Sequence, residues 1–226
     1  MDGDGFDDLL VGAGGDDEYG TDAGAAYLVL GSATPESRNL AAADAKFTGE
    51  VAGDFAGLSV STAGDVNGDG FDDVLVGAPY ANAGGGVAYL LLGSTEPSTR
   101  SLHAADAQLW GDPDGEFAGI SIAGAGDTDG DGFGDVLVGA VDNADGGYMA
   151  GAAYLMLGSA SPASLFLDTA EAQFSGAAAG DNAGFGVAGA GDVDGDGLAD
   201  LLVGAYDDDD GGANAGAAYL ILGTGL

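Results

Sequence analysis

Two kinds of short apolar run alternate with acidic, glycine-rich segments, and the same order of segments repeats along the whole chain. One run reads Leu/Val-Leu-Val-Gly-Ala and starts at Leu9, Val74, Val136 and Leu201. The other reads Ala-Tyr-Leu-X-Leu-Gly and starts at Ala26, Ala88, Ala153 and Ala218. Short runs rich in Val, Leu and Tyr between Gly and Asp are typical of strands. Because the runs are continuously apolar, we expect strands that are buried on both faces.

Helices are not indicated by the pattern. No segment keeps a helical periodicity for the length of a standard helix, and the best candidate, residues 40–45, is too short.

The repeat has a period of 62 to 65 residues, measured between Asp4, Asp69, Asp131 and Asp196. Each unit contains a small-residue segment such as residues 55–64, an acidic loop, the two apolar runs and a closing polar segment. About four strands per unit, packed on both faces, predict an all-β fold with the blades of a β-propeller. The small-residue segment suits an inner strand, where blades crowd near the axis. A parallel β-helix is the alternative, but its repeat is far shorter.

No stretch falls outside this register, so the sequence predicts one propeller segment over residues 1–226. The expected blades cover about residues 1–49, 50–111, 112–176 and 177–226. The first would lack its inner strand and the last its outer strand. Because the chain begins inside an acidic loop and shows no signal peptide, we expect a fragment or a processed chain.

The acidic loops carry the clearest candidate chemistry. In the fourth loop, residues 192–200, aspartates stand at positions one, three, five and nine, with glycines between them. A loop of this kind can turn sharply and offer only oxygen to a cation, and Ca²⁺ takes six to eight oxygens in flexible geometry. A single such run is more simply an acidic turn. Four copies at matching places in a repeat indicate a metal loop instead.

By analogy with EF-hand loops, we expect side-chain ligands at positions one, three and five, a backbone carbonyl at position seven, and a carboxylate at position nine that can bind with both oxygens. The expected ligands of the three full loops are Asp65, Asn67, Asp69, Phe71 and Asp73; Asp127, Asp129, Asp131, Phe133 and Asp135; and Asp192, Asp194, Asp196, Leu198 and Asp200. The first loop is incomplete and offers Asp2, Asp4, Phe6 and Asp8. Magnesium prefers a compact octahedron with its own waters, and zinc prefers nitrogen or sulfur, so calcium is the expected ion.

The charge balance limits the partners. The chain has 38 acidic and three basic residues, a formal net charge of −35. Nucleic acid and anionic membranes both need cationic surfaces, so neither is an expected partner. No apolar segment reaches the length of a membrane span. The absence of cysteine excludes disulfides, thiolate metal sites and a cysteine nucleophile.

Three acidic clusters lie between the two apolar runs, at residues 16–18, 142–145 and 207–210. They fit solvated loop tips, secondary calcium sites, an acidic adhesive face or adaptation to high salt. His103 fits a surface residue, and a single histidine without cysteine supplies no nucleophile–base set. Trp110 and the recurring tyrosines fit core packing better than a sugar-binding platform. We therefore expect no catalytic residues.

The repeat resembles the FG-GAP repeats of integrin α-subunit propellers and their bacterial relatives, and the resemblance covers the whole chain. Residues 77–79 form a full Gly-Ala-Pro element, whereas the other three copies lose the proline. The Phe-Gly element is also altered: Phe55 and Phe117 stand two residues before their glycines, and Phe185 lies between Gly184 and Gly186.

This family's fold implies a propeller of about seven blades, of which the chain would hold about four. The resemblance thus predicts a partial propeller that completes itself by self-association, as a dimeric ring or a filament. We expect an extracellular or cell-surface, calcium-binding module with a structural or adhesive role, a protein or glycan ligand and no enzymatic activity. The alternative is a non-catalytic propeller domain of a larger secreted hydrolase.

Overall fold

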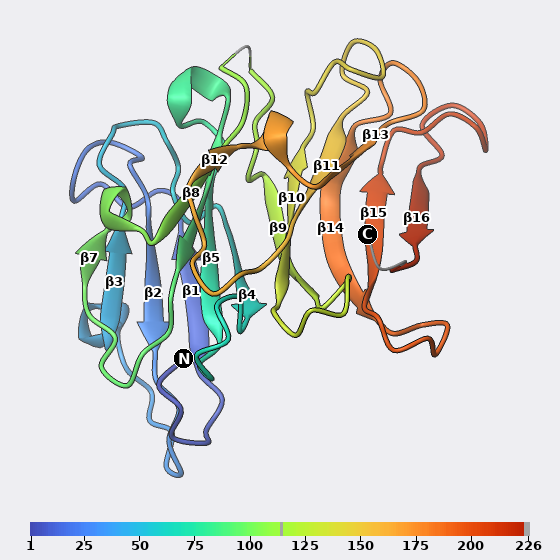
Figure 1. Cartoon of the computed structure of the whole chain (residues 1–226). Coiled ribbons are helices and arrows are strands. Elements are labelled where there is room, and N and C mark those ends of the chain that lie inside the picture. Colours follow the sequence, from blue (N-terminus) through green and yellow to red (C-terminus); the bar gives the residue numbers. More distant parts are fainter. Residues whose placement is uncertain (114, 224–226) are drawn as a thin grey trace.

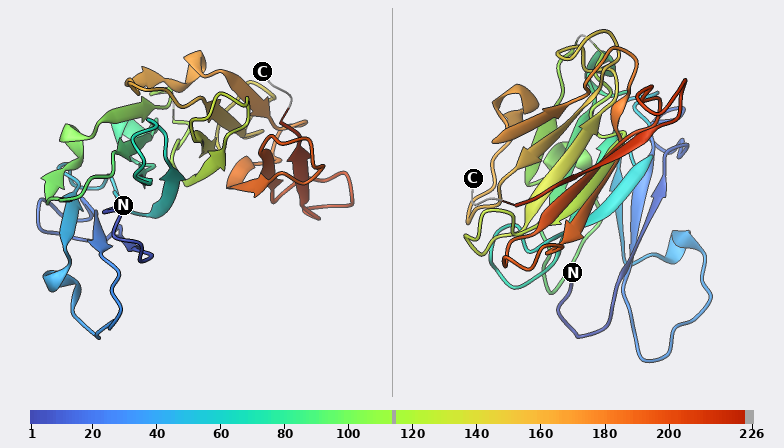
Figure 2. Two further views of the ribbon diagram at one scale, coloured as in Figure 1. Left: turned by 60° about the horizontal axis from the view of Figure 1, so that its bottom comes forward. Right: turned by 90° about the vertical axis from the view of Figure 1, so that its right-hand side faces the viewer.

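Four β-sheets stand side by side along an open arc (Figures 1 and 2) in a computed structural model that describes residues 1–113 and 115–223. The sheets consist of β1 (Leu9–Ala13), β2 (Ala25–Val29) and β3 (Ala45–Thr48); β4 (Ser59–Gly64), β5 (Asp73–Ala78), β6 (Val87–Leu91) and β8 (Ala107–Trp110); β9 (Ser121–Gly126), β10 (Asp135–Ala140), β11 (Ala152–Met156) and β13 (Ala172–Ser175); and β14 (Ala183–Gly191), β15 (Asp200–Ala205) and β16 (Ala217–Ile221). Consecutive strands within each sheet are antiparallel. The predicted all-β fold, a partial β-propeller, is confirmed.

Two short strands join a different sheet from the one that their sequence position suggests. β7 (Arg100–Ser101) pairs in parallel with β3, and β12 (Leu165–Phe166) pairs in parallel with β8. Each therefore extends the outer edge of the preceding sheet. The helical segments among the described residues are four 3-10 turns: η1 (Leu40–Ala42), η2 (Asn82–Gly84), η3 (Leu102–Ala104) and η4 (Leu167–Thr169). No helix in this part of the chain is long and apolar enough to cross a membrane.

The hydrophobic core lies between neighbouring sheets. Every residue of β5 and of β10 is buried, as the continuous apolar runs predict, because each of these strands has a sheet on both sides. Between the first two sheets, Leu28 and Phe47 pack in one cluster with Val76. Between the third and fourth, Leu155 packs with Val203. Burial of such side chains stabilises each pair of blades by roughly 1.5–3 kcal/mol per side chain.

Glycines of two repeated motifs interlock adjacent blades. A Cβ atom at Gly77, in the Val-Gly-Ala run, would lie 2.1 Å from the carbonyl oxygen of Gly119 in the next blade. Gly12 approaches the carbonyl oxygen of Gly57 in the same way, also at 2.1 Å. Only glycine permits this backbone contact. The glycine of the Val-Gly-Ala run is therefore needed wherever the next blade lies against it.

The inner strands turn directly into the acidic loops. β4, β9 and β14 each contain a register shift one or two residues before their loop begins. Such a bulge bends the strand and redirects the chain. All four acidic loops consequently lie along one rim of the arc, at the lower edge of Figure 1, where β1, β5, β10 and β15 begin.

Candidate metal centre

The third acidic loop, residues 127–135, curls around the carboxylate of its first residue. One oxygen of Asp127, Oδ1, accepts the backbone N–H of Gly130 at 2.7 Å, and the other, Oδ2, accepts that of Gly132 at 3.0 Å. Gly130 and Gly132 have φ of 83° and 93°, a left-handed backbone that favours glycine. The two glycines are thus required by the turn, and the turn places the later carboxylates around the first.

Positions one, three and nine converge in two of the loops. In Asp127, Asp129 and Asp135, and again in Asp192, Asp194 and Asp200, one ligand oxygen from each residue lies within 4.8 Å of the others. Calcium binds oxygens at about 2.3–2.6 Å, so two oxygens on one ion are at most about 5 Å apart. Asp131 and Asp196, at position five, are not part of these groups. Oδ1 of each accepts an N–H at 2.9 Å, from Phe133 and Leu198 respectively.

The second loop, residues 65–73, has the same turn. Asp65 Oδ1 accepts the N–H of Gly68 and its Oδ2 accepts that of Gly70, at 2.7 and 2.9 Å. At position three Asn67 replaces an aspartate, and its amide donates to Asp69 Oδ2 at 2.9 Å. At the expected ligand positions this loop therefore offers three carboxylates, one fewer than the third and fourth loops.

The first loop, residues 1–8, repeats the later part of the pattern. Asp2 Oδ1 accepts the N–H of Asp4 at 3.1 Å, and Asp4 Oδ1 accepts that of Phe6 at 2.9 Å. Asp131 N donates to Asp129 Oδ1 in the same way, at 3.0 Å. Asp2 and Asp4 thus accept the same local N–H bonds as their counterparts in the full loops, whereas Asp8 Oδ2 faces the N-terminal amine at 3.5 Å.

The four aspartates at position nine (Asp8, Asp73, Asp135 and Asp200) have a structural role that sequence reasoning missed. Oδ1 of each accepts the N–H of the glycine that closes the second apolar run of its own blade, at 2.8 Å: Gly31, Gly93, Gly158 and Gly223. In the three full loops, Oδ2 also accepts the N–H of position two, at 2.7 to 2.9 Å. The signal was present in the sequence, because that glycine recurs in every repeat.

Burial sets the proton affinity of these carboxyls in the metal-free protein. Asp73 is fully buried, and burial raises its pKa to about 6, although the N–H groups of Gly93 and Val66 lower it and nearby Asp69 raises it further. Burial likewise raises the pKa of Asp135, against the hydrogen bonds from Thr128 and Gly158.

Calcium affinity at the second loop should therefore fall in mild acid. Asp73 is protonated below about pH 6, so an ion must displace a proton there, and its apparent affinity should drop by up to about tenfold per pH unit below that pKa. The folded-state pKa is higher than the unfolded one. Protonation of Asp73 between about pH 6 and pH 4 thus stabilises the metal-free folded state relative to the unfolded state, and at the same time it weakens calcium binding. Titration calorimetry at pH 7, 6 and 5, in buffers of different ionisation enthalpy, measures the calcium affinity and the number of protons that the ion displaces. An affinity that is flat across this range would contradict the assignment.

The donor set fits calcium. The third and fourth loops present carboxylate oxygens that converge within reach of one ion, with no nitrogen or sulfur ligand among them. A bound divalent cation would supply positive charge and so offset the repulsion between these carboxylates. Zinc would require imidazole or thiolate ligands.

The acidic clusters at the other end of the blades do not form such groups. Asp16 Oδ2 accepts from Tyr27 Oη at 2.6 Å and from Lys46 Nζ at 2.9 Å, and Lys46 also bridges to Glu18 at 2.6 Å. Burial alone would lower the pKa of Lys46, but its bonds to Glu18 and Asp16 outweigh this effect and raise it. In the fourth blade Asp208 accepts from Tyr219 Oη at 2.6 Å. Side chains of these clusters thus hold the loop tips to the recurring tyrosines.

The remaining candidates have structural partners. Tyr154 is 2% exposed, and Trp110 packs against Phe166 with ring centroids 5.4 Å apart. His103 is exposed.

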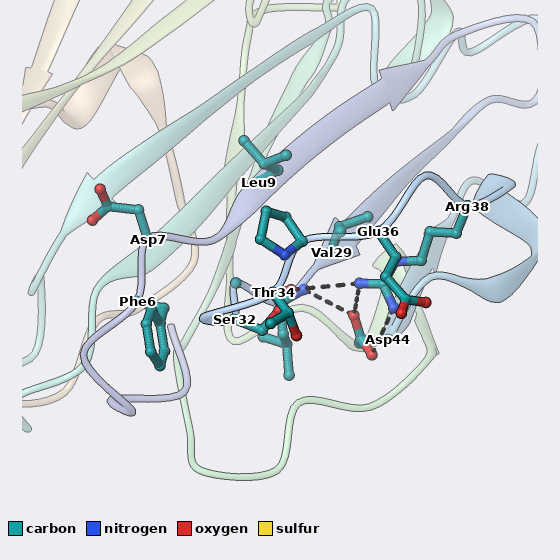
Figure 3. A pocket seen from close by; sticks show the side chains of 12 residues that line it. Phe6, Asp7, Leu9, Val29, Ser32, Thr34, Glu36, Arg38 and Asp44 are labelled. Atoms are coloured by element: carbon teal, nitrogen blue, oxygen red, sulfur yellow. Dashed lines mark hydrogen bonds and ion pairs between the residues drawn. The ribbon is translucent and has the colours of Figure 1, made fainter.

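Figure 3 shows a groove beside the first acidic loop in which Arg38 faces Asp44. Because this guanidinium is bonded to the Asp44 carboxylate and to the carbonyl of Leu30, the groove offers no free cation for an anionic ligand.

Known proteins share this repeat. A family model described as FG-GAP repeat matches residues 1–29, 56–91 and 183–221. Integrin alpha-PS2 of Drosophila melanogaster is 36% identical over 151 residues, 62% of this chain, and integrin alpha-IIb of Mus musculus is 35% identical over 148 residues, also 62%. Integrin alpha pat-2 of Caenorhabditis briggsae is 31% identical over 222 residues, 91% of this chain. The chain spans only 11%, 14% and 17% of these relatives' lengths.

Proposed function

Because the chain belongs to the integrin α-like FG-GAP repeat family, we propose that it is a calcium-binding, extracellular module with a structural and adhesive role. The observation that carries the proposal is the convergence of Asp127, Asp129 and Asp135, and of their counterparts in the fourth loop, at the same place in successive blades. Extracellular modules bind calcium with dissociation constants of about 10⁻⁴–10⁻³ M, which calcium outside cells can saturate.

A direct count of bound ions tests the proposal. Calorimetric titration at neutral pH should give three calcium ions per chain from the full loops and at most one weaker ion from residues 1–8. Magnesium at the same concentration should compete poorly, because it gives up its waters reluctantly. A count of none or one ion would contradict the metal assignment.

The adhesive role rests on the relatives and on the chemistry that the chain can offer. The similar proteins are integrin alpha chains. With one histidine and no cysteine, the chain has no nucleophile–base set built on either residue. The aspartates that the structure brings together are assigned to metal. A protein or glycan ligand is the partner that such a module would bind, and the −35 charge favours a cationic surface on it.

Self-association is the second part of the proposal, and the outer face of the fourth sheet supports it. Leu202 and Leu220, which pair across β15 and β16, are 39% and 48% exposed. Their counterparts in the third blade, Leu137 and Leu155, are fully buried under the fourth sheet. On the first sheet Leu9 is 62% exposed, whereas its counterpart Val74 is 4% exposed. Both outer faces therefore expose apolar side chains at positions that are buried between neighbouring sheets elsewhere in the molecule.

We therefore propose that the fourth sheet of one copy packs on the first sheet of another. These are different surfaces, so the contact is heterologous and gives a closed ring or a filament. Calcium should promote it, because bound ions reduce the repulsion between chains of charge −35.

Light scattering at micromolar protein should show dimers or longer assemblies in calcium and smaller species in chelator. Leu220→Glu, on the exposed face of the fourth sheet, should dissociate the assemblies, whereas Val51→Glu, on a loop and 60% exposed, should not. A protein that is monomeric in calcium would rule this association out.

A further inference from the structure

The acidic loops of successive blades touch one another through the backbone. The N–H of Gly134, at position eight of the third loop, donates to the carbonyl of Asp65, at position one of the second loop, at 2.8 Å. The N–H of Ala199 donates to the carbonyl of Asp127 in the same way, also at 2.8 Å. The third and the fourth loop are thus each bonded to the residue that opens the preceding loop.

A side-chain contact lies beside each of these bonds. A Cβ atom at Gly68 would lie 2.7 Å from the ring of Phe133, so this ring covers the backbone of the second loop. Gly3 has the same relation to Phe71, at 2.8 Å, and Gly130 to Leu198, at 3.1 Å. In each pair the covering side chain belongs to position seven, whose carbonyl is an expected ligand. The residue whose carbonyl would hold an ion in one loop therefore packs on the turn of the preceding loop.

The position-nine aspartates provide a second link. Asp135 Oδ1 accepts the N–H of Gly158, and the adjacent N–H of Ser159 donates to the carbonyl of Val66 in the second loop at 2.9 Å. Ser94 N donates to the carbonyl of Met1 at 3.0 Å, next to the bond between Gly93 and Asp73. One dipeptide thus connects position nine of the second loop to position two of the first, and a matching dipeptide connects the third loop to the second.

From these contacts we infer that the loops bind calcium with positive cooperativity between neighbours. The inference rests on the proposed calcium binding. An ion held in the third loop fixes positions seven to nine, and these fix the backbone of positions one, two and four in the second loop. The second loop then loses less conformational freedom when its own ion binds, which raises its affinity. The coupling passes between adjacent loops, so the third loop is the link between the second and the fourth.

Electrostatics acts in the opposite direction. An ion in one loop reduces the negative potential that attracts an ion to the next loop. At 0.15 M salt the Debye length is about 8 Å, so this effect between exposed loops is strongly screened. The backbone contacts are not screened. Cooperativity should therefore be clearest at physiological ionic strength.

Two variants with the same number of full loops test the coupling. Asp129→Ala with Asp131→Ala disables the third loop and leaves the second and fourth, which do not adjoin. Asp194→Ala with Asp196→Ala disables the fourth loop and leaves the second and third, which do. In 0.15 M salt, calorimetry should show about tenfold tighter and cooperative binding in the fourth-loop variant, and weaker binding with a Hill coefficient of one in the third-loop variant.

The outcomes separate this inference from the proposed function. If the wild-type protein binds no calcium, the proposed function fails. If it binds calcium but the two variants bind it equally well, only the coupling fails. Asp→Asn changes at the same positions serve if an alanine variant does not fold. Phe133→Ala, which keeps the carbonyl but removes the ring from Gly68, should reduce the cooperativity of an otherwise intact protein, and an unchanged Hill coefficient would oppose the inferred route.

Discussion

Removing calcium with excess chelator should lower the melting temperature of the protein by roughly 15–30 °C. An ion at 100 times its dissociation constant stabilises the folded state by about 2.7 kcal/mol per site. For a chain of this size, 1 kcal/mol moves the melting temperature by about 2–4 °C, and there are three full loops. Without the ion, converging carboxylates such as those of Asp127, Asp129 and Asp135 repel one another, by roughly 4 kcal/mol for two charges about 4 Å apart at an effective dielectric of 20.

Thermal unfolding followed by circular dichroism in calcium, in chelator and in chelator with re-added calcium measures this effect. Magnesium at equal ionic strength is the matched control for general screening of the −35 charge. Magnesium should recover a small part of the loss and calcium all of it. Identical melts with calcium and with chelator would exclude a stabilising metal.

The elements that the sequence predicted are those whose signal is local and repeated. The apolar run at residues 74–78 became β5, and the small-residue segment at 55–64 contains the inner strand β4. Four copies of one pattern removed the ambiguity that a single run of this length would have had. The acidic loops were equally readable, because Asp and Gly at fixed spacing determine both the turn and its donors.

Contacts between blades could not be predicted from one unit alone. The pairing of β7 with β3 joins residues 53 positions apart, at Phe47 and Arg100, and nothing local in Arg100–Ser101 indicates it. The approach of Gly77 to Gly119 likewise depends on how one blade lies on the next. Asp16 looked like part of a solvated acidic cluster, whereas Lys46 and Tyr27 bind its carboxylate. In each case tertiary packing decided the role of the residue.

Asp135→Ala should abolish calcium binding at the third loop and also destabilise the metal-free protein by about 3 kcal/mol or more. The carboxylate is fully buried and accepts three hydrogen bonds: one from Gly158 N, and two from Thr128, through its N–H and its hydroxyl. Each buried donor left without an acceptor costs about 1–3 kcal/mol. Loss of the ligand removes the ion, and loss of the acceptor also frees the end of the second apolar run from the loop.

Asp131→Ala is the matched control, because it removes a carboxylate of the same loop that is exposed and accepts only the N–H of Phe133. It should weaken calcium binding while leaving metal-free stability within about 0.5 kcal/mol of the wild type. Urea unfolding in chelator measures stability without the ion, and calorimetry measures binding. Because the two aspartates differ in burial and in the donors they satisfy, equal stability of the two variants in chelator would show that Asp135 serves only as a ligand. A lower stability for Asp135→Ala alone would establish that one carboxylate both closes the blade and completes its metal loop.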